Sequence, residues 1–161
     1  MDFGDLMFPH PTDQADYHRP KDGLLQAFGV VQDTEIRNPQ HLDAHGEKCM
    51  FVVKNGLSTG TTFGRANGLG SFKRTYDEYG IINQTSIDIA ILPYDKMHGS
   101  FSAAGDSGSI VLDRKGRILG TITGGSGATD RTDITSLTPY WWIEEQIKAQ
   151  YPDAFLYQVV Q

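Results

Sequence analysis

Short stretches in which apolar and polar residues alternate dominate the middle of this chain. The clearest is Thr85–Leu92, where Ile87, Ile89 and Ile91 fall on one face and Pro93 ends the pairing. Successive side chains of a β-strand point to opposite sides, so this alternation is typical of a strand with one buried face. We therefore predict a half-buried strand here.

Turn signals bound other β-prone stretches. Met50–Lys54 is followed by Asn55-Gly56, and Thr61–Ala66 is followed by Asn67-Gly68. Both residues of an Asn-Gly pair tolerate a positive φ, which favours a tight turn between strands. The first stretch and its turn therefore predict a hairpin.

A second hairpin is predicted further along the chain. Ser109–Leu112 and Arg117–Thr123 are β-prone, and the compact polar connection Asp113–Gly116 joins them. Several short strands and glycine-rich turns, with 18 Gly in all, predict a small antiparallel barrel or sandwich.

The two ends of the chain have different patterns. Thr138 and Pro139 have N-cap and N1 character. Apolar residues then recur near helical spacing until Pro152, which predicts one amphipathic helix that packs the C-terminal end onto the fold: Tyr140, Ile143, Ile147 and Tyr151.

The first residues lack any regular periodicity. We expect residues 1–22 to form an extended arm, because prolines interrupt a mixture of polar residues there. Leu24–Val31 could pair as an edge strand, and Gln32–Lys48 is expected to be loop with at most one helical turn. The predicted domain therefore spans 23–151, with a tail at 152–161.

Composition narrows the functional classes. The chain has 161 residues and a net charge of −6, which disfavours nucleic acid and membrane surfaces as partners. Cys49 is the single cysteine, so no internal disulfide can form, and no signal peptide is visible; we expect an intracellular, cytoplasmic location. No metal or cofactor motif is present. We expect Cys49 to be buried, and Trp141 and Trp142 to pack the helix instead of forming a ligand cage.

The candidate chemistry lies in Gly105-Asp106-Ser107-Gly108-Ser109. Alone, this is an ordinary polar turn, but its setting is more specific. Across Phe101–Leu112 and Gly116–Gly125 the order of loop, strand, turn, strand and glycine pair resembles the active-site hairpin of chymotrypsin-like serine peptidases. Phe51–Thr62 resembles the opening hairpin of the same barrel.

This resemblance implies the C-terminal, serine-bearing half of the chymotrypsin-like fold. That half is mainly β, a six-stranded antiparallel Greek-key barrel with a C-terminal α-helix. The chain also resembles a group of fungal trypsin-like proteins, in which a stretch similar to Ser126–Asp130 leads into one similar to Asp133–Thr135.

The resemblance also implies roles for the residues of the loop. The serine matching Ser107 is the nucleophile, and the backbone N–H groups matching Gly105 and Ser107 form the oxyanion hole. Asp106 would be buried behind this hole and support the loop, so it needs a cationic partner. In many relatives that partner is a newly cleaved N-terminal ammonium; here an arginine or hydrogen bonds must substitute.

The substrate side is implied in the same way. Phe101 matches the floor of the primary specificity pocket, which argues against Arg or Lys specificity, and Ser102 follows it. Thr123, Gly124 and Gly125 match the strand that pairs with a bound peptide, although a glycine-rich strand end is an equal alternative.

The enzyme interpretation lacks a base. A serine needs a general base within hydrogen-bond reach, and the family takes its histidine and aspartate from a first barrel. The segment before residue 48 is too short and polar to form that barrel. None of the histidines falls in the family's histidine motif, so we expect ordinary surface or turn residues: His10, His18, His41, His45 and His98.

Three hypotheses follow. The first is a serine-peptidase-like domain that is inactive or weakly hydrolytic alone. The second is an active serine endopeptidase completed by a separate N-terminal barrel. The third is a pseudoenzyme that holds extended peptides along the Thr123–Gly125 edge without cutting them.

Overall fold

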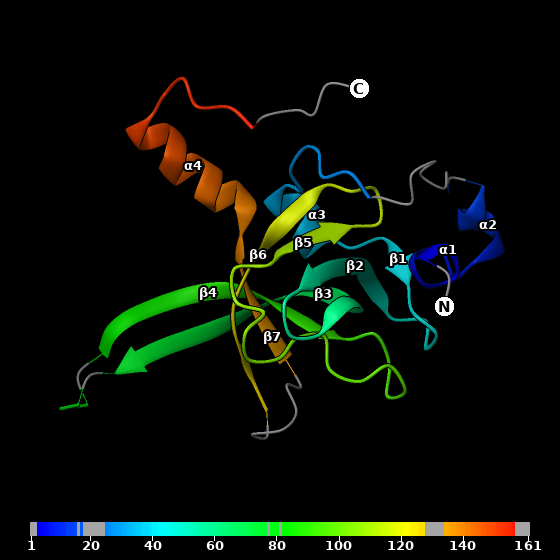
Figure 1. Ribbon diagram of the computed structural model, residues 1–161, viewed down its shortest axis with the longest axis horizontal. Helices are drawn as coiled ribbons and strands as arrows, with labels where there is room; N and C mark the ends of the chain where they lie inside the picture. Colours follow the sequence, from blue (N-terminus) through cyan, green and yellow to red (C-terminus); the bar gives the residue numbers. More distant parts are fainter. Residues whose placement is uncertain are drawn as a thin grey trace.

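Six antiparallel strands form a closed barrel in the computed structural model, which describes residues 3–15, 17, 25–76, 78–80, 82–127 and 134–156 (Figure 1). The strand order is β2-β3-β4-β7-β6-β5, and β5 pairs back with β2, Leu112 opposite Val53. The predicted barrel is confirmed and the sandwich alternative is excluded. The strands are β2 (Lys48–Gly56), β3 (Gly60–Tyr76), β4 (Ile82–Pro93), β5 (Ile110–Asp113), β6 (Ile118–Ser126) and β7 (Ile134–Pro139).

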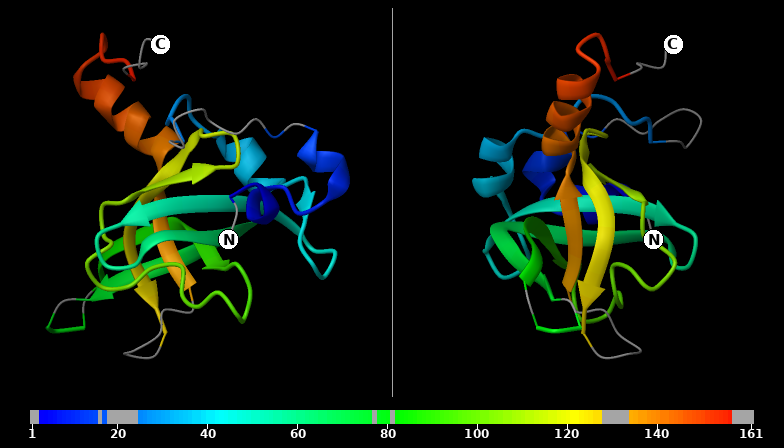
Figure 2. Two further views of the ribbon diagram at one scale, coloured as in Figure 1. Left: turned by 45° about the vertical axis from the view of Figure 1, so that its right-hand side comes forward. Right: turned by 90° about the vertical axis from the view of Figure 1, so that its left-hand side faces the viewer.

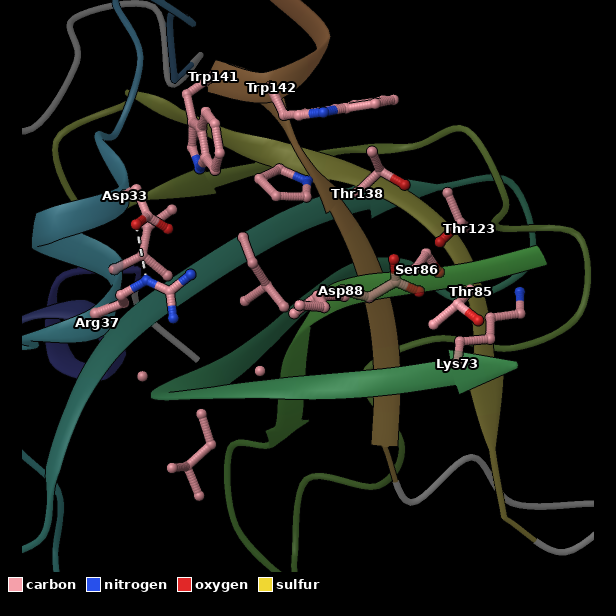
Figure 3. Close-up of a pocket in the computed structure, with 17 residues that line it drawn as sticks. Asp33, Arg37, Lys73, Thr85, Ser86, Asp88, Thr123, Thr138, Trp141 and Trp142 are labelled. Carbon is pink, nitrogen blue, oxygen red and sulfur yellow. Dashed lines mark hydrogen bonds and ion pairs between the residues drawn. The ribbon is translucent and has the colours of Figure 1, made fainter. Parts of the chain in front are cut away.

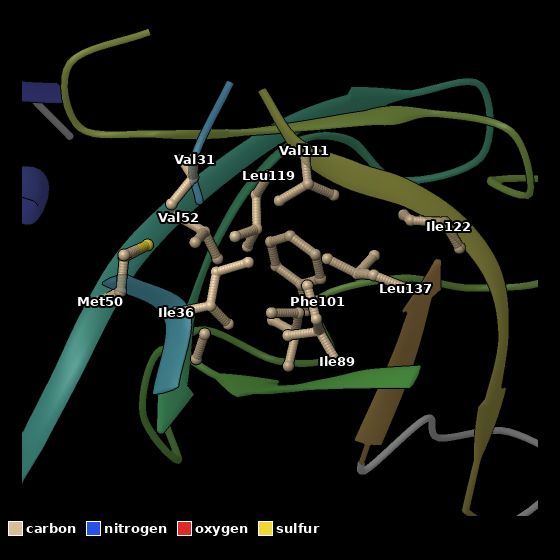
Figure 4. Packing of buried hydrophobic residues seen from close by; sticks show 12 residues of the cluster. Val31, Ile36, Met50, Val52, Ile89, Phe101, Val111, Leu119, Ile122 and Leu137 are labelled. Atoms are coloured by element: carbon tan, nitrogen blue, oxygen red, sulfur yellow. The ribbon is translucent and has the colours of Figure 1, made fainter. Parts of the chain in front are cut away.

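Alternation along each strand fills the barrel. On β2, Met50 and Val52 point inward, whereas Cys49, Phe51 and Val53 belong to a second cluster on its outer face. The interior is closely packed around Phe101, as Figure 4 shows. It consists of Val31, Ile36, Met50, Val52, Ala66, Ile89, Ile91, Phe101, Val111, Leu119, Ile122 and Leu137.

The prediction of an extended N-terminal arm is wrong. The arm contains two short helices, α1 (Phe3–Met7) and α2 (Pro11–Gln14), and α1 lies against the outer face of β2 (Figure 2). Met7 and Phe8 are buried there against Phe51, which gives these residues the apolar contacts that fix the segment.

The segment between arm and barrel behaves largely as predicted. Its one helical turn is α3 (Asp33–Arg37), started by a capping box between Gln32 and Glu35. The expected edge strand reduces to a single parallel bridge from Val30 to Ile118. A seventh strand, β1 (His41–Leu42), pairs with β2 outside the barrel.

The C-terminal helix is present but does not pack as predicted. α4 (Tyr140–Gln150) starts after Pro139, one residue later than expected, and none of its residues is fully buried. It projects from the barrel in Figures 1 and 2, and Ile147 is 41% exposed. Only Trp141, in its first turn, packs against the core, because the helix continues the direction of β7 away from the barrel.

Parts of the predicted domain organisation fall on residues that the structure does not describe. The boundary at residues 22 and 23 and the last part of the tail, 157–161, lie outside the described residues. Among the described residues no helix is long and apolar enough to cross a bilayer. The intracellular location stays a prediction.

Candidate active site

Ser107 lies at an exposed turn between β4 and β5. Backbone hydrogen bonds fix the turn: Asp106 N–H donates to Ala103 O (3.0 Å) and Ser109 N–H to Asp106 O (3.0 Å). Gly108 N–H donates to Ile122 O on β6 (2.8 Å), which ties the loop to the barrel. The Ser107 side chain is therefore held at the barrel surface, outside the core.

Two amides of this loop have no acceptor within the described part of the chain. Neither Gly105 N–H nor Ser107 N–H donates a hydrogen bond to any residue in the described ranges. Gly105 has φ +98°, and a Cβ there would lie 2.3 Å from Ser58 Oγ, so only glycine fits. An oxyanion hole requires such free, pre-positioned donors next to a nucleophile.

Asp106 anchors the loop from inside. Its side chain is fully buried, and Lys54, also fully buried, places Nζ 3.2 Å from Asp106 Oδ2. Thr59 Oγ1 donates to the same oxygen (2.6 Å), Ser58 N–H donates to Oδ1 (2.8 Å), and Ala103 N–H donates to Oδ2 (3.1 Å). Buried carboxylates are tolerated when they are paired and hydrogen-bonded in this way.

Lys54 is the functional residue that the sequence interpretation missed. An arginine or hydrogen bonds were expected to replace the terminal ammonium; the structure supplies a lysine together with hydrogen bonds. The signal was present in the alternation of β2, because Lys54 follows Val52 by two residues and therefore points inward. Lys54 also donates to Thr59 Oγ1 and to Gly60 O (2.9 Å), so that with Asp106 its three protons have three acceptors.

The environment keeps Asp106 ionised. Burial alone would raise the pKa of this carboxyl, but the hydrogen bonds from Thr59, Ala103 and Ser58, together with Lys54, lower it well below its ordinary value. The anionic form is therefore the form that the fold holds in place.

The residues predicted at the specificity pocket are placed differently. Phe101 is 1% exposed in the middle of the barrel core, so its side chain is not accessible to a substrate, and we correct that assignment. The reason is size: the aromatic ring fills the barrel interior at the point where the loop leaves it. Ser102 is also buried, and its hydroxyl is bonded to Thr135 Oγ1 (2.7 Å).

The glycine-rich end of β6 has one free edge. Gly124 and Gly125 pair with β7 on one side, whereas β5 pairing ends at Thr121, opposite Ile110. Within the described residues no strand pairs with the other edge of Thr123–Gly125. This stretch lies immediately after Ile122, which accepts the Gly108 bond of the candidate loop. An extended peptide could add there as a strand.

No histidine completes the site within the described residues. Ser107 makes no hydrogen bond to a described residue. His98 Nδ1 lies 2.6 Å from Asp95, and His41 is stacked on Phe51 with its pKa lowered by burial. His10 contacts Leu42 O (3.0 Å), and His18 lies outside the described residues. The described part of the chain also contains no group of three His, Cys, Asp or Glu that could hold a metal ion.

Comparison with known proteins finds similarity among solved structures alone. No protein-family model and no curated protein matches the chain. An inactive form of Rv3671c from M. tuberculosis, a serine-to-alanine mutant, matches with TM-score 0.49 and 16% identity over 82% of this chain and 56% of that one. A glutamic acid specific serine protease matches with TM-score 0.48 and 17% identity, over 81% and 55%.

The active form of the Rv3671c protease matches with TM-score 0.44 and 17% identity, over 84% of this chain and 50% of that one. The chain thus spans about half the length of these solved proteins. Each of them is a serine protease or a mutant of one, and the resemblance to the fungal group stays a prediction.

Proposed function

We propose that this chain is a serine-peptidase-like domain in which Ser107 is the nucleophile. The observation that carries the proposal is a pair of amides, Gly105 and Ser107, that have no acceptor among the described residues and lie with the exposed Ser107 on a loop anchored by buried Asp106. This arrangement would stabilise an oxyanion formed on attack at a carbonyl or phosphonyl centre.

The domain is proposed to be inactive or weakly hydrolytic alone. A serine hydroxyl without a base is a weak nucleophile, and Ser107 has no histidine partner in the described part of the chain. The oxyanion donors and the loop can nevertheless give residual reactivity towards strong electrophiles, because electrostatic stabilisation survives loss of the base.

An active-site-directed fluorophosphonate probe followed by mass spectrometry tests this proposal. We expect slow adduct formation at Ser107, its loss in Ser107→Ala, and unchanged labelling in Ser71→Ala, a serine on the β3–β4 hairpin. Absence of any adduct at Ser107, with or without a partner, would overturn the assignment of a nucleophile.

A completed enzyme is the second candidate. Apolar side chains on the β3–β4 hairpin and α4 are exposed, among them Phe72 (72%), Ile87 (52%) and Trp142 (46%), and a docking barrel would cover such a surface. In that case an added N-terminal barrel that carries histidine and aspartate should accelerate labelling of Ser107 and of no other serine.

A peptide-binding module is the third candidate, favoured by the free edge of Thr123–Gly125. It would bind extended peptides with the same affinity in Ser107→Ala and would not be acylated by them. Peptide binding that is weakened when the edge is blocked by proline at Gly125, together with no adduct, would select this function over either enzyme.

A further inference from the structure

A cavity of about 530 Å³ lies on the barrel, lined by parts of α3, the β3–β4 hairpin, β6, β7 and the start of α4. Figure 3 shows Trp141 and Trp142 at one end, with Lys73, Thr85 and Thr123 to one side and Asp88 between them. Neither the Ser107 loop nor its anchor Asp106 contributes to the lining. The cavity is therefore a candidate binding site distinct from the Ser107 loop.

Two polar groups of this lining have no hydrogen-bond partner among the described residues. Asp88 on β4 is 4% exposed, and its carboxylate makes no hydrogen bond or ion pair with a residue in the described ranges. Trp141 Nε1 is buried and likewise lacks an acceptor there. Trp141 Nε1–H is a donor and is enclosed in the protein, whereas the Asp88 carboxylate belongs to a residue of the cavity lining and offers hydrogen-bond acceptors. Because buried polar groups in folded proteins are nearly always satisfied, this carboxylate indicates a ligand that donates hydrogen bonds.

The charges of the lining determine the sign of that ligand. Asp33 and Arg37 neutralise each other through an ion pair of 2.7 Å. Lys73 is exposed, and its Nζ lies 3.6 Å from where a Cβ of Gly124 would be, out over β6. Lys73 and Asp88 are therefore the two charges of the lining that have no ion pair within the described residues, and Asp88, the buried one of the two, is negative.

We propose that this cavity binds an organic cation, an alkylammonium or a guanidinium group, through Asp88. The carboxylate accepts hydrogen bonds from the cationic head. Trp141 and Trp142 provide aromatic surface for its apolar stem and for a cation–π contact.

The same head group has two sources. It is either a small free amine or guanidine, or the end of a Lys or Arg side chain. Thr123 belongs both to the cavity lining and to the free edge of β6, so a peptide on that edge could direct a basic side chain inward. Neither source requires chemistry at Ser107, so the inference stands apart from the proposed function.

The chain carries its own reporter for this site. It has two tryptophans in total, Trp141 and Trp142, and both line the cavity. Titration with butylguanidinium and butylammonium should give a saturable change in tryptophan fluorescence, whereas butyramide and butyrate should give none. Equal responses to the neutral and anionic compounds, or no saturable response to either cation, would overturn the proposal.

Variants of two carboxylates in the same lining sharpen the test. Asp88→Asn keeps the shape but removes the charge, and should weaken cation binding by about tenfold or more, the loss expected for a charged hydrogen bond. Asp33→Asn, the matched control, makes the same change of charge at the exposed Asp33–Arg37 pair and should leave affinity within about twofold, because water and salt screen an exposed charge. Equal effects of the two substitutions would contradict the role of Asp88.

A stability measurement checks that Asp88 is unpartnered. Asp88→Asn should raise the urea midpoint in the absence of ligand, because it removes a buried charge, whereas a structural carboxylate would give a lower midpoint. Lys73→Gln should retain or tighten cation binding. If cations bound to Lys73→Gln and not to the wild type, the occupant would be Lys73 itself and the proposal would fail.

Titration with peptides distinguishes a free cation from a basic side chain as the ligand. A short extended peptide with one arginine, bound much more tightly than butylguanidinium and than its alanine counterpart, would identify a side chain as the ligand. Affinity for the peptide no greater than for butylguanidinium would identify a free cation. Because the cation titration does not involve Ser107, its failure would leave the proposed nucleophile untouched, and failure of probe labelling would leave the cation site untouched.

Discussion

The buried pair Lys54–Asp106 makes the sharpest prediction about this fold. Lys54→Met replaces an ammonium of zero exposure by an apolar side chain of similar length and leaves the Asp106 carboxylate buried without its cation. The carboxylate keeps its bonds from Thr59 Oγ1, Ser58 N–H and Ala103 N–H, so the loss falls on the charge and not on every contact.

The magnitude follows from the cost of an uncompensated buried charge. Removing one partner of a buried ion pair typically costs about 3–5 kcal/mol, and the surviving hydrogen bonds place Lys54→Met near 3 kcal/mol. With a urea slope of about 2 kcal/mol per M, that loss lowers the urea midpoint by about 1.5 M. Since a domain has a total stability of about 5–15 kcal/mol, the variant should still fold.

Urea unfolding followed by tryptophan fluorescence measures the effect. Lys48→Met provides the matched control, because Lys48 lies on the same strand but is exposed and has no ion pair within the described residues. The free energy of unfolding of Lys48→Met should change by less than about 0.5 kcal/mol. With the same slope, its urea midpoint should move by less than about 0.25 M. Lys54→Met should also slow adduct formation at Ser107, because the loop that carries the proposed oxyanion donors loses the cation that anchors it.

The double variant Lys54→Met/Asp106→Leu tests whether the loss of stability in Lys54→Met comes from the isolated buried charge of Asp106. Removing both charges should restore part of the stability, since an apolar pair replaces an isolated buried anion. The reasoning is refuted if Lys54→Met costs no more than Lys48→Met, or if the double variant is less stable than the sum of the single ones predicts.

Three further outcomes are expected from other parts of the structure. The lowered pKa of Asp106 contributes stability at neutral pH that is lost as the pH falls below about 4, so urea midpoints should drop there and drop less in Asp106→Asn. Burial raises the pKa of the Cys49 thiol to about 11, so a thiol reagent should modify Cys49 at the rate of unfolding and not faster. Gly105→Ala should abolish probe labelling, because Gly105 has φ +98° and an added Cβ would clash with Ser58 Oγ. Gly99→Ala is the control: Gly99 has φ +73° but an added Cβ would meet no atom within 4 Å. It should therefore cost only the backbone strain of about 1–2 kcal/mol, which a urea midpoint measures.

The strands were predictable because strand alternation is a local signal, whereas the choice of a barrel over a sandwich came from the family resemblance. Ile89 and Ile91 are buried as their spacing indicated, but Ile87 on the same face is 52% exposed, since β4 and β3 continue beyond the end of the barrel. Periodicity specifies which face a residue lies on; it does not specify where the covering layer stops.

The errors at the two ends have the same cause. The arm becomes helical because Met7 and Phe8 find the outer face of β2, a contact between segments far apart in sequence. The pattern of α4 predicted packing along its whole length, but the direction of β7 carries it off the barrel after Trp141. Tertiary contacts determine both the conformation of the arm and the packing of α4, and such contacts cannot be predicted from a short stretch of sequence.

The candidate site was found through the sequence motif Gly105–Ser109, but this motif does not include Lys54, the residue that anchors Asp106. Gly105, Asp106 and Ser107 are adjacent in sequence, whereas Lys54 lies on another strand and reads locally as an ordinary lysine before a turn. Only the inward phase of β2 distinguishes it. Phe101 shows a different error. The resemblance placed it at the floor of a specificity pocket, whereas its ring packs in the hydrophobic core of the barrel.

The position of Lys54 has a consequence for control of the site. A cation that belongs to β2 is in place as soon as β2 pairs with β3 and β5, so the Asp106 loop is ordered by folding itself. No cleavage is then needed to supply the charge that orders the proposed oxyanion donors. Under the proposed function, control over reactivity at Ser107 acts at the delivery of a base or of a substrate, and proteolysis of the chain should not increase probe labelling.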